Sequence, residues 1–126
     1  MGFLKERGRS FKYAFAGIKN AVCTQRNARI HLVAAIVAVT CGIILEISVI
    51  EWMFVVVAIG FVITAEIINT AIEKLVDLVS PERQEKAGIV KDLSAGAVLI
   101  ASLMAFLIGS IIFIPKILQF FVTSNV

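Results

Sequence analysis

Three long runs of apolar residues, at about 29–50, 52–79 and 93–120, constrain this sequence more than any other feature. Each run is long enough to cross the hydrocarbon core of a bilayer as a helix, which takes about 20 residues. Of the 126 residues, 60% are hydrophobic, more than a soluble domain of this length can bury in one core. The sequence therefore predicts an all-α integral membrane protein with three transmembrane helices, and the short polar connections predict a single domain over 1–126.

A further helix is predicted over about 3–27, before the first span. Phe11, Phe15, Ile18 and Val22 recur at i, i+4, i+7 and i+11, with basic residues around them. This pattern is typical of an amphipathic helix in the membrane surface, although a cytosolic helix packed on the spans is equally compatible with it. The apolar residues of this basic N-terminal stretch are spaced rather than continuous, so no cleavable signal peptide is expected.

The basic residues near the ends of the spans predict the orientation of the chain, because cytoplasmic flanks of membrane helices are enriched in Lys and Arg. Such residues precede the first span and flank the connection between the second and third: Lys5, Arg7, Arg9, Lys12, Lys19, Arg26, Arg29, Lys74, Arg83, Lys86 and Lys91. The turn that contains Glu46 and Glu51 has none, and the C-terminal tail has only Lys116. We therefore expect a multi-pass protein with a cytoplasmic N-terminus and with Trp52 as an anchor at the outer interface.

Pro81 marks the expected end of the second span, at about Ser80, because proline disfavours helical geometry in the residue before it. The stretch "SPERQEKAGIVKD" is then a short polar connection on the cytoplasmic side. We expect Gly88 to be its flexible point and Asp92 to cap the N-terminus of the third span.

Small residues fall in helical rows within two of the spans, and such rows allow membrane helices to approach closely. They are Ala34, Ala38 and Gly42 in the first span and Ala97, Ala101, Ala105 and Gly109 in the third.

Cys23 and Cys41 have no partner at CxxC spacing and are interpreted as small apolar residues. His31 has no companion at ligand spacing, so no metal site is expected there.

The stretch "AEIINTAIEKLVD" places polar and acidic residues in the second span. Glu66, Asn69, Thr70, Glu73 and Asp77 follow the spacing i, i+3, i+4, i+7 and i+11. At the periodicity of an α-helix this spacing puts all of them on one face. The sequence therefore predicts an acidic stripe along the middle helix.

The acids of the stripe lie at different depths in the membrane and are therefore interpreted differently. With about 1.5 Å of rise per residue from Trp52, Glu66 lies about 21 Å into the membrane and Glu73 about 31 Å. Because the hydrocarbon core is about 30 Å thick, Glu66 is inside it and Glu73 is at its cytoplasmic edge. A carboxylate at the depth of Glu66 costs on the order of a few kcal/mol unless it is neutral, paired or beside a polar cavity, so it indicates a function.

A structural interpretation also exists for these acids. Glu73 and Asp77 would then be ordinary interfacial charges, and Glu66 a protonated acid bonded to a neighbouring helix. For the whole stripe we favour a functional role, because Lys91 and Asp92 reach the same cytoplasmic edge from the other side of a short connection.

The stripe suits phosphoryl transfer between a donor in water and an acceptor in the membrane. Hard oxygen ligands at the cytoplasmic edge suit Mg²⁺, which takes one or two carboxylates plus the phosphate oxygens of a nucleotide. Lys91 would neutralise those phosphates. Glu66, about 10 Å deeper than Glu73, is reachable by a lipid alcohol whose tails stay in the bilayer. It would be the general base for the hydroxyl proton, with Asn69 to orient it.

Two stretches carry a family resemblance. "AEIINTAIEKLVD" has the pattern E-x-x-N-[ST]-A-I-E-x-x-x-D, and "GIVKDLSAGAVLIAS" contains K-D-x-x-[SA] at the entry to the last span. Together they resemble the prokaryotic diacylglycerol kinase family, small membrane enzymes with three spans, and the resemblance covers nearly the whole chain. "SFKYAFAGIKNAV", "RNARIHL" and "EW" look more like its Gram-positive branch, whose members phosphorylate undecaprenol, than the Gram-negative branch that prefers diacylglycerol.

The resemblance implies roles for the residues that match family positions. Glu66 would be the catalytic base, and Glu73 would bind Mg²⁺. The residues implied around ATP are Tyr13, Asn69, Asp77, Glu82, Arg83, Gln84, Lys91 and Asp92, and those implied near the lipid are Arg29, Trp52, Ala95 and Glu66. The family forms homotrimers with sites built between subunits, and the resemblance also implies a place in the bacterial inner membrane.

Gln25, in "CTQRN", departs from the family pattern, which has an acidic residue beside Glu73 at the metal. A neutral amide is a weaker Mg²⁺ ligand than a carboxylate. Either Glu73 and the phosphates carry more of the metal binding, or this copy is impaired by an engineered change that preserves nucleotide binding.

Three functions stay open at this point. The first is an ATP-dependent kinase of a membrane lipid alcohol, undecaprenol in preference to diacylglycerol, with Mg²⁺ as cofactor. A small oligomeric ion or proton conductor would explain the buried acids but not Lys91 and Asp92. A membrane adaptor without enzymatic activity would leave Glu66 unexplained. The glycine-rich phosphate loops of soluble kinases are missing, and nucleic acid is not an expected partner.

Overall fold

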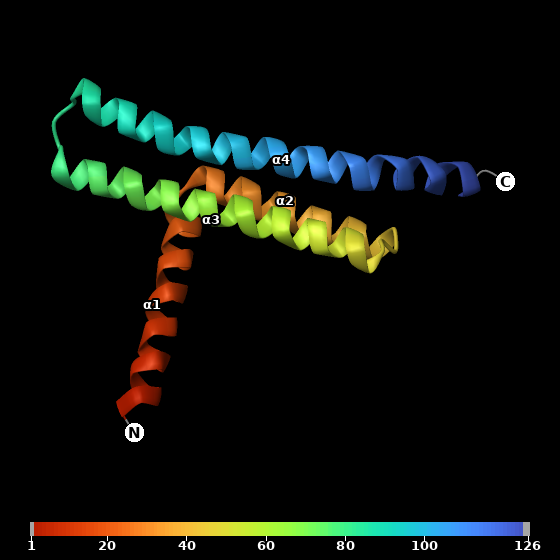
Figure 1. Cartoon of the computed structure of the whole chain (residues 1–126), viewed down its shortest axis with the longest axis horizontal. Helices are drawn as coiled ribbons and strands as arrows, with labels where there is room; N and C mark the ends of the chain where they lie inside the picture. The colour runs from red at the N-terminus through yellow and green to blue at the C-terminus, as the bar shows by residue number, and fades with distance from the viewer. Residues whose placement is uncertain (1, 125–126) are drawn as a thin grey trace.

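Four α-helices form the part of the chain that the computed structural model describes, residues 2–124. They are α1 (Gly2–Thr24), α2 (Arg26–Ile44), α3 (Val49–Val79) and α4 (Glu85–Ser124). Helices α2, α3 and α4 run side by side, and α1 leaves them crosswise from the start of α2 (Figure 1). By length and composition, α2, α3 and α4 can each cross a membrane. The predicted all-α membrane fold, with three spans after an N-terminal helix, is confirmed.

The turn between α2 and α3 shifts the helix ends away from the predicted boundaries. Helix α2 ends at Ile44, not near 50, and Glu46 in the turn has a positive φ of 48°. Helix α3 begins at Val49, because Ser48 and Glu51 form a capping box. The Glu51 N–H donates to Ser48 Oγ at 3.3 Å, and the Ser48 N–H donates to Glu51 Oε2 at 2.7 Å. The length of an apolar run does not show at which residue such a turn begins or such a capped helix starts.

The connection between α3 and α4 is shorter than predicted. Helix α3 ends at Val79, and Pro81 follows closely, as the restriction imposed by proline requires. Helix α4 begins at Glu85, so Gly88 and Asp92, expected as the flexible point and the N-cap, lie inside the helix instead. The polar start of α4 contains Glu, Lys and Ala, which are good helix formers and extend the helix beyond its apolar part.

Helix α1 is separated from α2 by Gln25, whose backbone is extended (φ −103°, ψ 125°). It therefore ends at Thr24 rather than near 27. Its last turns contact the bundle, where Lys74 of α3 donates a hydrogen bond to Asn20 Oδ1. The apolar side chains nearer its middle, Phe11 among them, are exposed. Most of α1 is thus free of the bundle, with an apolar face that no other helix of the same chain covers.

The packed core of a single chain lies near the α2–α3 turn. Ile47, Val55 and Ile112 are buried there, and Lys116 of α4 forms a salt bridge with Glu51 of α3 at 3.4 Å. Elsewhere many large apolar side chains of the three spans are exposed. Such surfaces suit helices that face lipid or other subunits.

Gly42 is expected to be intolerant of a side chain, because Trp52 fills the space beside it. A Cβ at Gly42 would lie 2.8 Å from Trp52 Cη2 and 3.0 Å from Ile47 Cδ1. Overpacking of this kind costs about 1–3 kcal/mol. We expect Gly42→Ala to lower the unfolding temperature of the protein in detergent. Gly60→Ala is the matched control, since a Cβ at Gly60 meets no atom within 4 Å; equal losses in both variants would contradict this prediction.

Candidate active site

The stripe predicted along the middle helix is directed at the other helices of the bundle. Glu66, Asn69 and Thr70 of α3 are buried, and Glu66 retains only 3% of its accessible surface. Ser94 of α4 is the other buried polar side chain in residues 2–124 for which burial is described. Helix α3 therefore turns this polar stretch toward α2 and α4, in line with Val55 and Val62, which are buried on the same side of the helix.

Glu73 joins this stripe to the break between α1 and α2. Gln25 Nε2 donates to Glu73 Oε2 at 3.4 Å, and Asn69 Nδ2 donates to Glu73 Oε1 at 3.1 Å. Ser94 Oγ in turn donates to Asn69 Oδ1 at 2.6 Å. Because Gln25 has left helical geometry, its side chain can reach α3, and one row of polar groups connects the break between α1 and α2 with α3 and α4.

The end of the bundle beyond Glu73 is open and charged. Lys91 of α4 forms a salt bridge with Asp77 of α3. Both residues line a groove formed by the last turn of α3, the connection and the first turns of α4. Its other polar lining residues are Ser80, Glu82, Arg83, Gln84 and Glu85. This groove is accessible to polar solutes, unlike the surroundings of Glu66.

Glu66 faces His31 of α2 at the deep end of the stripe. The distance from His31 Nε2 to Glu66 Oε2 is 3.9 Å, which is too long for a hydrogen bond. Among the side chains whose burial the structure describes, Glu66 Oε2 is the one buried nitrogen or oxygen without a hydrogen-bond partner. Thr70 Oγ1 donates to the backbone carbonyl of Glu66 and leaves its carboxylate untouched.

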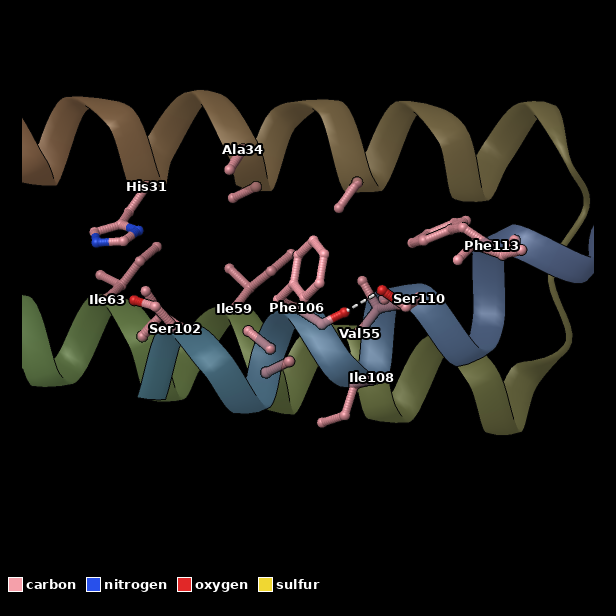
Figure 2. A pocket seen from close by; sticks show the side chains of 17 residues that line it. His31, Ala34, Val55, Ile59, Ile63, Ser102, Phe106, Ile108, Ser110 and Phe113 are labelled. Atoms are coloured by element: carbon pink, nitrogen blue, oxygen red, sulfur yellow. Dashed lines mark hydrogen bonds between the residues drawn. The ribbon is translucent and has the colours of Figure 1, made fainter. Parts of the chain in front are cut away.

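An apolar groove of about 560 Å³ adjoins His31 between α2, α3 and α4. In Figure 2, His31 points from α2 into this groove, opposite Ile63 and Ser102. The hydroxyls of Ser102 and Ser110 donate to carbonyls of their own helix, at 2.8 Å each. The remaining lining is apolar apart from His31, so the groove suits a hydrocarbon chain.

Several residues implied by the resemblance are not brought to this row within one chain. Tyr13 is exposed on α1, about 18 Å from Gln25 along the helix axis. Arg29, Asp92 and Ala95 are exposed on their helices. Trp52 packs on Gly42 at the opposite end of the bundle, about 21 Å from Glu66 along α3.

Two residues of the site were absent from the sequence-based set of site residues. Ser94 lies one helical turn after Lys91, and that spacing would have placed it on the face that meets α3. His31 follows Gln25 along α2 by about as many residues as Glu66 precedes Glu73 along α3. Because α2 and α3 are antiparallel, this register brings His31 opposite Glu66 once Gln25 is opposite Glu73.

The polar row offers a limited set of metal ligands. Among residues 2–124, no group of three His, Cys, Asp or Glu side chains could hold a metal ion. Glu73 supplies one carboxylate, and the amides of Gln25 and Asn69 next to it also carry oxygens. Mg²⁺ is commonly bound by one or two carboxylates together with substrate phosphates. The residues present therefore fit an Mg²⁺ that arrives with a nucleotide, and do not fit a site made of protein groups alone.

Comparisons with known proteins identify the family of this chain. Residues 12–113 match the family described as prokaryotic diacylglycerol kinase. The chain is 39% identical to the undecaprenol kinase of Bacillus subtilis over 109 residues, which cover 86% of this chain and 89% of that protein. It is 38% identical to a diacylglycerol kinase of Synechocystis over 114 residues, which cover 90% of this chain and 65% of that protein. It is 32% identical to the diacylglycerol kinase of Escherichia coli over 93 residues, which cover 74% of this chain and 76% of that protein. The chain is a membrane-embedded lipid kinase and belongs to the prokaryotic diacylglycerol kinase family.

Proposed function

We propose that this kinase transfers the γ-phosphoryl group of ATP to the hydroxyl of undecaprenol, with Glu66 as the general base. Diacylglycerol is the alternative acceptor. The proposal depends on one observation above all: the buried carboxylate of Glu66 shares a helix face with Glu73, Asn69 and the row that leads to the open groove. The name of the Bacillus subtilis relative supports undecaprenol, and the two other relatives support the alternative.

The donor would bind at the open end of the bundle. Glu73, with the Gln25 amide, would hold Mg²⁺, and that ion would supply charge neutralisation on the transferred phosphoryl group. Lys91, now paired with Asp77, would turn to the phosphates. The residues proposed to complete the nucleotide site are Tyr13, Asn69, Glu82, Arg83, Gln84 and Asp92.

The acceptor would approach Glu66 from the membrane. A carboxylate with an unpartnered oxygen in apolar surroundings is available to take a hydroxyl proton, as a general base must. Helix α3, with 31 residues, is about 46 Å long and exceeds the hydrocarbon core of about 30 Å. Its inner end can therefore reach water while Glu66 stays at the depth of lipid chains.

We also propose a homotrimer with composite sites in the bacterial inner membrane. Tyr13, Arg29, Asp92 and Ala95 are exposed in one chain, so a neighbouring subunit would bring them to a site. The crosswise direction of α1 suits a helix in the membrane surface when the other helices span the membrane (Figure 1). The stretch before the first span is rich in Lys and Arg, and the α3–α4 connection also carries basic residues. These charges support a cytoplasmic location for both segments.

Phosphate transfer from labelled ATP tests the proposed function. The full chain in lipid nanodiscs would be given undecaprenol or diacylglycerol at equal mole fraction, with and without Mg²⁺. We expect Mg²⁺-dependent labelling of undecaprenol with a higher kcat/KM than for diacylglycerol. The reverse order would replace undecaprenol by the alternative, and labelling without divalent cations would refute the role of Glu73.

Gln25→Glu is expected to increase the apparent affinity for Mg²⁺ by about tenfold, because it places a second carboxylate beside Glu73. Without the ion, the same change replaces a hydrogen bond by repulsion between like charges. Initial rates measured across a Mg²⁺ titration would report the shift. Gln119→Glu is the control, since Gln119 is exposed near the other end of the bundle; an unchanged titration curve for Gln25→Glu would remove Gln25 from the metal site.

A further inference from the structure

His31 has a position that neither the sequence nor the family resemblance assigned to a function. Its imidazole lines the apolar groove and stands 3.9 Å from the unpartnered Glu66 Oε2. Its side chain is 22% exposed, whereas that of Glu66 is 4% exposed. His31 therefore lines the groove, and Glu66 lies buried beside it.

The spacing of the two side chains allows one hydroxyl group beside them to contact both. An oxygen about 2.8 Å from each of two atoms that are 3.9 Å apart makes hydrogen bonds of ordinary length to both. A hydroxyl is a donor and an acceptor at once, so it can accept from an imidazole N–H and donate to a carboxylate. A direct bond between His31 and Glu66 would need the two groups to approach by about 1 Å.

The apolar lining of the groove indicates which kind of molecule would carry that hydroxyl. No titratable side chain other than His31 lines it, and its serine hydroxyls are bonded to their own helix. In Figure 2 the groove continues away from His31, past Ile59 and Phe106, toward Phe113. A lipid alcohol with its hydroxyl at His31 would keep its hydrocarbon chain among these apolar side chains.

We infer that His31 Nε2 donates a hydrogen bond to the oxygen of the acceptor hydroxyl and holds it against Glu66 Oε2. This inference rests on the proposed function. In the step, the hydroxyl proton passes to Glu66 Oε2 and the acceptor oxygen forms a bond to the γ-phosphorus. The bond from that phosphorus to the oxygen of ADP breaks, and ADP leaves with its electron pair. His31 gains and loses no proton in this step.

Kinetics of variants at position 31 test the inference, with the full chain in nanodiscs and undecaprenol and ATP varied in turn. His31→Leu removes the donor and is expected to raise the KM for undecaprenol by about tenfold, with the KM for ATP changed less than about twofold. His31→Gln is expected to restore most of the lipid KM, because its Nε2 amide donor has a similar reach. Asn27→Leu is the control, since it removes an exposed polar side chain from the same helix outside the groove.

Each outcome separates this inference from the proposed function. If the wild-type chain labels no lipid alcohol, the proposed function fails and the inference fails with it. If the wild-type chain is active and His31→Leu leaves the lipid KM unchanged, or raises both KM values equally, the inference alone is overturned. If His31→Leu does not fold, His31→Gln and the shorter His31→Asn decide: a lower lipid KM for the Gln variant supports the inference, and equal values overturn it.

Discussion

Glu66→Gln is expected to lower the rate of phosphoryl transfer to the lipid acceptor by about 10²–10⁴-fold, the usual contribution of a general base. The substitution keeps the size of the side chain and removes its ability to take a proton. Because Glu66 is buried and lies about 10 Å along α3 from Glu73, nucleotide binding at the open groove should be retained. Single-turnover labelling of undecaprenol measures the rate, and the binding of a fluorescent ATP analogue measures the retained site.

Glu46→Gln is the matched control, because it makes the same chemical change in the exposed turn between α2 and α3. We expect it to transfer phosphate at the wild-type rate. A Glu66→Gln variant that kept more than about a tenth of the wild-type rate would exclude Glu66 as the base. A loss of ATP-analogue binding in parallel with the rate would instead indicate damage to the whole site.

Glu73→Gln is expected to weaken the apparent affinity for Mg²⁺ by on the order of 100-fold, a loss that disruption of the groups around a metal commonly causes. Glu73 supplies the one carboxylate of the polar row, and its two oxygens now accept from Gln25 and Asn69. An amide there would present an N–H₂ group to one of these donors and leave hydrogens unpaired, at a cost of about 1–3 kcal/mol. Rates across a Mg²⁺ titration and thermal unfolding with and without Mg²⁺ measure the two effects.

High Mg²⁺ should restore much of the rate of Glu73→Gln, and it should not restore Glu66→Gln. This difference separates a metal ligand from a base. Glu6→Gln on the exposed part of α1 controls for the loss of one negative charge near the cytoplasmic side. Equal Mg²⁺ titration curves for Glu73→Gln and the wild type would show that Glu73 does not hold the ion.

The spans and the acidic stripe were predictable because each depends on a property local in sequence. Apolar runs of sufficient length form helices in a membrane, since only there are all backbone groups paired. The spacing of Glu66, Asn69 and Glu73 puts them on one face by helix periodicity alone, and the structure directs that face to α2 and α4. Pro81 similarly identified the end of α3 through a restriction on its direct neighbour.

The helix ends that were predicted differently depend on groups other than apolar side chains. The capping box of Ser48 and Glu51 starts α3 earlier than its apolar run, and helix-forming charged residues extend α4 back to Glu85. Such residues carry a weak local preference that the contact between α3 and α4 reinforces. A prediction from hydrophobicity alone does not detect this preference for the helix.

The sequence by itself determined the membrane class, the three spans, and the set of acids on the face of α3, since chain-local periodicity and composition specify all of these. Only the tertiary structure decided which groups those acids meet. The antiparallel packing of α2 on α3 places His31 opposite Glu66, and the packing of α4 brings Ser94 to Asn69. The groove beside His31 arises in the same way, because its lining comes from three helices and exists only where they pack together.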